Sequence, residues 1–314
     1  LLFSYAILLV PESLMDYVTG LPQITYLEKP KLLYFADAFV RSISCITPVQ
    51  EGVMGLSGNG VLLACIDSGV DYAHPDFCAP DGTSRIAILW DQTIPGNPPM
   101  GYALGSVYTR QQINEALASS TPEERFALVP SRDVTGHGTA VLGIAAGNGR
   151  SSADAAMRGV APEATLVVVK LGNPDPADLP RTSQLLQAVD FCVRYALLVE
   201  RPLVINLSFG NNYGSHSGDS LLETYLNAVS NLGQNVICIG AGNEGDTGRH
   251  YAGNLKSDRK SSGQTQTVRA TSDPAATSAV SATADRAVSV EFQVGAYESS
   301  FSLQIWKVYG DEIS

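Results

Sequence analysis

The sequence predicts an α/β fold in which helices cover a mostly parallel β-sheet. Four short runs are apolar throughout, rich in Val, Ile and Leu, and bounded by Gly, Pro, Asn or Asp, as buried parallel strands are. These runs are Val61–Ile66, Leu166–Val169, Leu203–Leu207 and Asn235–Ile239. Between them lie helical stretches such as Thr182 to Glu200 and Ser220 to Leu232. Strands that alternate with helices indicate a covered parallel sheet.

Length and charge narrow the class of protein. The 314 residues, of which 45% are hydrophobic, are enough for one large core with attached segments. A formal net charge of −11 argues against a nucleic-acid surface, because a phosphate backbone selects for clustered Lys and Arg. We therefore expect no nucleic-acid partner. The mean hydropathy of +0.06 is that of a globular chain, so we expect no membrane partner either.

The five cysteines are widely spread and contain no C-x-x-C pair. An odd, scattered set predicts neither a disulfide framework nor a zinc site. We expect most of them to be buried as small hydrophobic side chains.

Polar residues directly follow several of the predicted strands. Ligands of parallel sheets bind in the crevice beyond the carboxyl ends of the strands. Asp67, Ser208 and Asn243 stand at such positions. A carboxylate at Asp67 can be held out of water and pointed at a partner, although an Asp that caps a turn is the alternative.

His137 is the second candidate and lies in Gly136-His137-Gly138-Thr139, ahead of a run of small residues. That run predicts a helix that packs very closely against the sheet and presents His137 from its first turn. A structural histidine is the alternative, and the flanking glycines favour the functional reading.

Asn243 is the third candidate and lies in the Gly-rich stretch Gly240–Gly245. A side-chain amide on such a loop can stabilise the negative charge of a tetrahedral intermediate. An Asn that forms a turn is the alternative.

These motifs together resemble the sequence blocks of the subtilase family of serine proteases, in the family's order. The blocks are Ile66–Val70, Gly136–Thr139, Ile205–Gly210 and Ala241–Gly245. The resemblance implies a subtilisin-like three-layer fold. It also implies that Asp67 orients His137, that His137 is the general base and then acid, and that Asn243 donates in the oxyanion hole.

The same resemblance implies the substrate-binding residues and the partners. Ser208, Phe209 and Gly210 would form the strand edge that pairs with an extended protein or peptide substrate. Gly240, Ala241 and Gly242 would form a wall of the S1 pocket. The chain's own propeptide would enter the cleft. No cofactor is expected, calcium is possible without assignable ligands, and the resemblance suggests a secreted or spore-associated protein.

The nucleophilic serine of the family should follow Asn243 in a Gly-Thr-Ser-x-Ala block. Nothing between Asn243 and Ser314 matches that block. Gly82-Thr83-Ser84 precedes a strand-like run and lies between the Asp and the His, so we do not expect Ser84 to be the nucleophile. Two hypotheses follow: a serine endopeptidase whose Ser lies beyond Ser314, or a catalytically inactive regulator on the same fold. Retention of Asp, His and Asn favours the enzyme.

The domain organisation predicted from the sequence has three segments. Residues 1–40 resemble the end of a subtilase propeptide, and we expect self-processing within Tyr34–Ala38. Residues 41–260 form a catalytic domain without its Ser block. Residues 261–314 begin an antiparallel β insertion, because Val288–Val294 and Phe301–Trp306 alternate with period two, and the family resemblance implies that this insertion is a jelly roll. Such an insertion is typical of the clostridial Csp-type germination proteases, which the chain also resembles at Leu89–Thr93.

Overall fold

The computed structural model describes residues 44–243, with gaps at 153–156, 173–179, 209 and 211–215. It also describes short pieces between residues 11 and 22 and the backbone of three strands between residues 266 and 290. The chain divides into two compact units, Leu1–Cys45 and Ile46–Ser314. In the first unit, Glu12–Leu14 forms the 3-10 turn η1.

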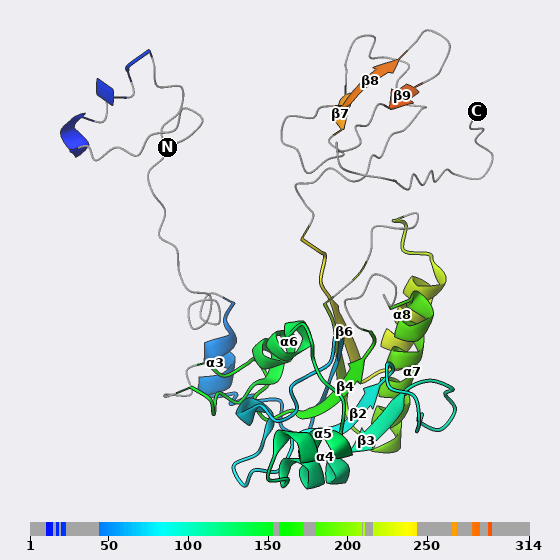
Figure 1. Ribbon diagram of the computed structural model, residues 1–314. Helices are drawn as coiled ribbons and strands as arrows, with labels where there is room; N and C mark the ends of the chain where they lie inside the picture. The colour runs from blue at the N-terminus through cyan, green and yellow to red at the C-terminus, as the bar shows by residue number, and fades with distance from the viewer. Residues whose placement is uncertain are drawn as a thin grey trace. The chain divides into compact units, whose positions relative to one another are not determined.

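The second unit is built on a six-stranded sheet with the strand order β3-β2-β4-β1-β5-β6 (Figure 1). The pairs of this sheet are parallel except for β2 with β3. Its strands are β1 (Leu62–Asp67), β2 (Ile86–Asp91), β3 (Ser106–Thr109), β4 (Thr165–Lys170), β5 (Leu203–Leu207) and β6 (Asn235–Ile239). The predicted mostly parallel sheet is confirmed, and each of the four apolar runs forms a strand.

Helices flank the sheet on both sides (Figure 1). The helices of this unit are α3 (Ile46–Glu51), α4 (Arg110–Leu117), α5 (Pro122–Leu128), α6 (His137–Ala146), α7 (Thr182–Leu198) and α8 (Leu221–Ser230), with the 3-10 turn η2 at Pro75–Phe77. The two predicted helices appear as α7 and α8. Ser220 begins α8 through a capping box, in which its hydroxyl accepts from the Glu223 amide and the Glu223 carboxylate accepts from the Ser220 amide.

The central strand β1 shows why the fold has three layers. Leu62, Ala64 and Ile66 belong to the hydrophobic cluster that contains the buried face of α7. Leu63 and Cys65 belong to a second cluster, which contains the buried residues of α6. Because successive side chains of a strand point to opposite faces, β1 is buried on both. The sheet is therefore the middle layer between helices.

The cysteines follow this layering. The prediction that most of them are buried is confirmed for Cys65, Cys78 and Cys192. Cys45 and Cys238 are exposed. Cys238 lies in β6, whose outer edge pairs with no strand in the part of the chain that the structure describes.

A separate three-stranded antiparallel sheet, in the order β7-β8-β9, follows in the chain. Its strands are β7 (Gln266–Val268), β8 (Ser278–Ala282) and β9 (Val288–Val290). The run Phe301–Trp306 and the processing site Tyr34–Ala38 lie outside the described residues, so the jelly-roll insertion and the propeptide stay predictions. Within the residues that are described, no helix combines the length and the apolar character needed to span a bilayer.

Candidate active site

Asp67 and His137 meet although seventy positions separate them. Asp67 is the last residue of β1 and His137 the first of α6. Nδ1 of His137 lies 2.7 Å from Oδ1 of Asp67. The Asp67 side chain is only 3% exposed, whereas the imidazole is 53% exposed. A buried carboxylate can thus hold the ring in one orientation and stabilise it when protonated, while the ring stays accessible to a reactant.

One oxygen of the Asp67 carboxylate accepts a hydrogen bond from the neighbouring backbone, and the other does not. The amide of Ser68 donates to Oδ1 of Asp67 at 2.7 Å. Oδ2 of Asp67 is buried and has no hydrogen-bond partner among the described residues. Buried acceptors without a donor are rare, and a catalytic role is one accepted reason for them.

Two glycines let α6 begin against the end of β1. Gly136, the residue before the helix, has a φ of 75°, in the left-handed region that glycine tolerates. At Gly138 an added Cβ would lie 2.2 Å from the Gly69 carbonyl oxygen and 3.1 Å from Oδ1 of Asp67. The close approach predicted for this helix is therefore present, and it requires the glycine that follows His137.

Five further predicted site residues lie at the same edge of the sheet. Ser208 directly follows β5, and Gly240, Ala241, Gly242 and Asn243 directly follow β6. Because β1, β5 and β6 are adjacent and parallel, these residues share the carboxyl edge with Asp67.

The loop after β6 is exposed, and its first amide, that of Gly240, donates to the Leu207 carbonyl at 3.0 Å. Gly210 is exposed as well, and Phe209 lies outside the described residues. The roles of Asn243 in the oxyanion hole and of these residues in substrate binding stay predictions.

Ser84 lies at the opposite edge of the sheet. It precedes β2, which runs parallel to β4 as β1 does, so the start of β2 is remote from the end of β1. The side chain is buried, and its oxygen accepts from the Ile86 amide at 3.1 Å. This location agrees with the prediction that Ser84 is not the nucleophile.

Two buried charged residues at the carboxyl edge were missed by the sequence reasoning. Asp91 ends β2 and Lys170 ends β4, and both are register partners in the row that contains Asp67. They are 0% and 3% exposed, respectively. The signal that could have found them is the one that found Asp67, a charged residue that closes an apolar run.

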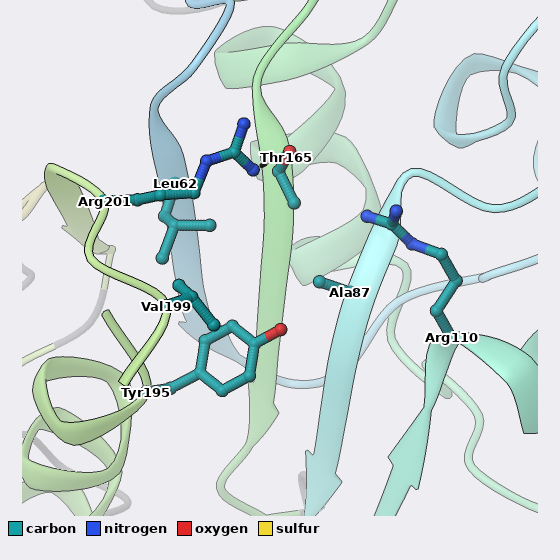
Figure 2. Close-up of a pocket in the computed structure, with 7 residues that line it drawn as sticks. All are labelled: Leu62, Ala87, Arg110, Thr165, Tyr195, Val199 and Arg201. Carbon is teal, nitrogen blue, oxygen red and sulfur yellow. Dashed lines mark hydrogen bonds between the residues drawn. The ribbon is translucent and has the colours of Figure 1, made fainter. Parts of the chain in front are cut away.

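A pocket of about 240 Å³ lies away from this edge, at the amino ends of β1 and β4 (Figure 2). Figure 2 shows the guanidinium of Arg201 beside Thr165, to whose hydroxyl it donates at 3.0 Å. The pocket is lined by Leu62, Ala87, Arg110, Thr165, Tyr195, Val199 and Arg201. No predicted site residue lines it, so it is separate from the Asp67–His137 site. Among the described residues, no group of three or more His, Cys, Asp or Glu side chains could hold a metal ion.

A mostly parallel sheet between helices, with a buried Asp at the end of its central strand hydrogen-bonded to a His that opens a helix, is the arrangement of the subtilisin-like class of proteins. Residues 58–303 match the subtilase family, peptidase S8. The chain belongs to this family, and the predicted resemblance is confirmed.

Individual relatives support the same assignment. The CspB protease of Clostridium perfringens has a similar structure, with a TM-score of 0.59, 35% identity, and coverage of 67% of this chain and 42% of that chain. Subtilisin E of Bacillus subtilis is 26% identical over 228 residues, which are 72% of this chain and 46% of that protein. The PI-type proteinase of Lactococcus lactis subsp. cremoris is 26% identical over 259 residues, 78% of this chain and 12% of that protein. The chain thus spans less than half the length of these relatives.

Proposed function

We propose that the full-length protein is a serine endopeptidase that hydrolyses peptide bonds in protein or peptide substrates. The observation that carries this proposal is the 2.7 Å contact between the buried Asp67 carboxylate and the exposed His137 ring. Membership of the subtilase family supports it. The nucleophilic serine is proposed to lie outside these 314 residues.

Each residue has a defined part in the proposed reaction. His137 takes the proton of the serine hydroxyl as that oxygen attacks the scissile carbonyl, and gives it to the leaving amine. Asp67 stabilises the imidazolium formed between these steps. Asn243 donates its amide to the oxyanion of the tetrahedral intermediate. A water molecule, deprotonated by His137, then attacks the acyl group on the serine, which releases the carboxylic acid product and returns the proton to the serine oxygen. These steps need water and no cofactor.

Substrate binding is proposed to use the carboxyl edge of the sheet. An extended peptide would pair with the backbone of Ser208–Gly210, as strand addition requires, and Gly240–Gly242 would form one wall of the S1 pocket. The propeptide would occupy the same edge before it is cut. The alternative, an inactive regulator, is favoured by no observation on the described residues, since Asp67 and His137 keep a productive contact.

Hydrolysis of an unstructured protein substrate by the full-length enzyme tests the proposal. We expect His137→Ala to abolish hydrolysis, and Asn243→Ala to lower kcat by about 10²–10³ with little change in KM, because the amide acts mainly in the transition state. That magnitude comes from subtilisin. If the full-length wild-type protein hydrolyses no substrate, or if His137→Ala leaves hydrolysis unchanged, the proposed endopeptidase function is wrong. A change mainly in KM would instead place Asn243 in substrate binding.

A further inference from the structure

The loop that leads into α6 is attached to the carboxyl ends of neighbouring strands. The hydroxyl of Ser131 donates to Oδ2 of Asp91, the last residue of β2, at 2.6 Å. Nζ of Lys170, the last residue of β4, donates to the carbonyl of Arg132 at 2.6 Å. Both attachments involve buried charged groups, whose hydrogen bonds are stronger than those between neutral groups.

Asp133 continues this series to the third strand. The hydroxyl of Ser68, the residue directly after β1, donates to Oδ1 of Asp133 at 2.8 Å. Because β2, β4 and β1 are adjacent in the sheet, three successive residues of the loop are attached to three successive strands. These hydrogen bonds fix the position of the loop along the edge of the sheet. The last of them lies next to β1, the strand that carries Asp67.

Asp133 and Ser68 also accept hydrogen bonds from backbone amides at the start of α6. A helix leaves its first amides without partners, and a side chain at the N-cap usually accepts from one of them. Gly136, the N-cap here, has no side chain to do so. The amides of Gly136 and Thr139 donate instead to the two oxygens of Asp133, at 3.0 and 2.8 Å. The Gly138 amide donates to the Ser68 hydroxyl at 3.0 Å.

We propose that Asp133 is a positioning residue for His137, because it fixes the first turn of α6 to the end of β1 and so sets the contact between His137 and Asp67. The effect of Asp133 on catalysis rests on the proposed function, whereas its effect on the geometry of the Asp67–His137 contact does not.

The ionisation state of Asp133 supports this role. Burial would raise the pKa of its carboxyl group, but hydrogen bonds from Thr139, Ser68 and Thr135 outweigh burial and hold the pKa below its usual value. The group is therefore a carboxylate near neutral pH. A negative charge beside the first turn of a helix also interacts favourably with the helix dipole.

Asp133→Asn in the full-length protein is the direct test. The amide keeps the shape of the side chain, but one of its two ends donates, so it cannot accept from both the Gly136 and Thr139 amides. We expect kcat to fall by about 10-fold to 100-fold with a much smaller change in KM, as slight misplacement of a catalytic group produces. The downfield proton resonance of Nδ1–H of His137, which reports its hydrogen bond to Asp67, should shift or broaden.

Asp190→Asn is the matched control. Asp190 also accepts three side-chain hydrogen bonds, from Tyr102, Tyr225 and Arg194, but it lies in α7. It should alter stability without changing kcat or the His137 resonance. If both Asn variants change kcat and the resonance alike, the role of Asp133 is only structural and the proposal is wrong.

Ser68→Ala covers the case in which Asp133→Asn does not fold, because it keeps the Asp133 carboxylate and removes the Ser68 hydroxyl that links it and the Gly138 amide to the end of β1. It should produce the same shift of the His137 resonance, and an unchanged resonance would overturn the proposal. An inactive wild-type protein would refute the proposed function alone, since the resonance is measured without a substrate.

Discussion

Gly138 decides how closely His137 can approach the Asp67 carboxylate. An alanine there would place Cβ 2.2 Å from a backbone oxygen, that of Gly69, and backbone atoms cannot move aside as a flexible side chain can. The first turn of α6 would have to shift away from β1. The Asp67–His137 contact would shift with it.

Gly138→Ala is therefore expected to lower the free energy of unfolding by about 1–3 kcal/mol, the usual cost of overpacking, and to reduce kcat as well. Gly143→Ala is the control within the same helix, because an added Cβ there meets nothing within 4 Å. It should stabilise the protein by about 0.5–1 kcal/mol, the usual gain of Ala over Gly inside a helix. Urea unfolding and peptide hydrolysis measure the two effects. Equal behaviour of the two variants would mean that Gly138 does not limit the packing of α6.

Besides its buried apolar face, helix α7 has a carboxylate, Asp190, that links it to two tyrosines outside the helix. Asp190 accepts hydrogen bonds from Tyr102 at 2.7 Å, from Tyr225 at 3.0 Å and from Arg194 at 2.7 Å. Burial would raise the pKa of Asp190, but these three donors outweigh burial and lower the pKa from its ordinary value. The folded state therefore favours the charged form more than the unfolded state does.

Because the pKa of Asp190 is lower in the folded state, its contribution to the free energy of unfolding is lost at acid pH. The stabilisation by Asp190 is complete above the pKa of the unfolded state, about 3.9, and is lost as the pH falls through the lower pKa of the folded state. We expect Asp190→Asn to reduce the free energy of unfolding at pH 7 and to flatten its decline below about pH 4. Urea unfolding at several pH values measures this. If the free energy of unfolding of the variant falls below about pH 4 as steeply as that of the wild type, Asp190 does not contribute to the decline.

Strands β1 and β4 could be predicted because they lie in the middle layer, where both faces are buried and the sequence is apolar throughout. Strand β6 has the same apolar pattern, although most of its residues are exposed in the part of the chain that the structure describes. Helix α6 could be predicted from its small residues, and the Asp67–His137 pair from its motifs. The anchoring of residues 131–133 could not. Ser131 and Asp91 lie forty positions apart, and their contact depends on the order of the strands, which local patterns do not specify.

Across the molecule, the residues proposed for the active site come from separate elements that meet at one edge of the sheet. Asp67 comes from β1, His137 from α6 and Asn243 from the loop after β6. The order of β1, β5 and β6 brings these segments to one side. The central claim is that this edge activates a serine outside these 314 residues.

Covalent labelling of the full-length protein with a fluorophosphonate probe tests that claim most directly, because the probe forms a stable bond with an activated serine. Intact mass and peptide mapping should show one adduct, on a serine that is not among these 314 residues, and His137→Ala should not be labelled. The isolated 314-residue chain should remain unlabelled. An adduct on Ser84 or on another serine of this chain, or labelling that persists in His137→Ala, would contradict the account.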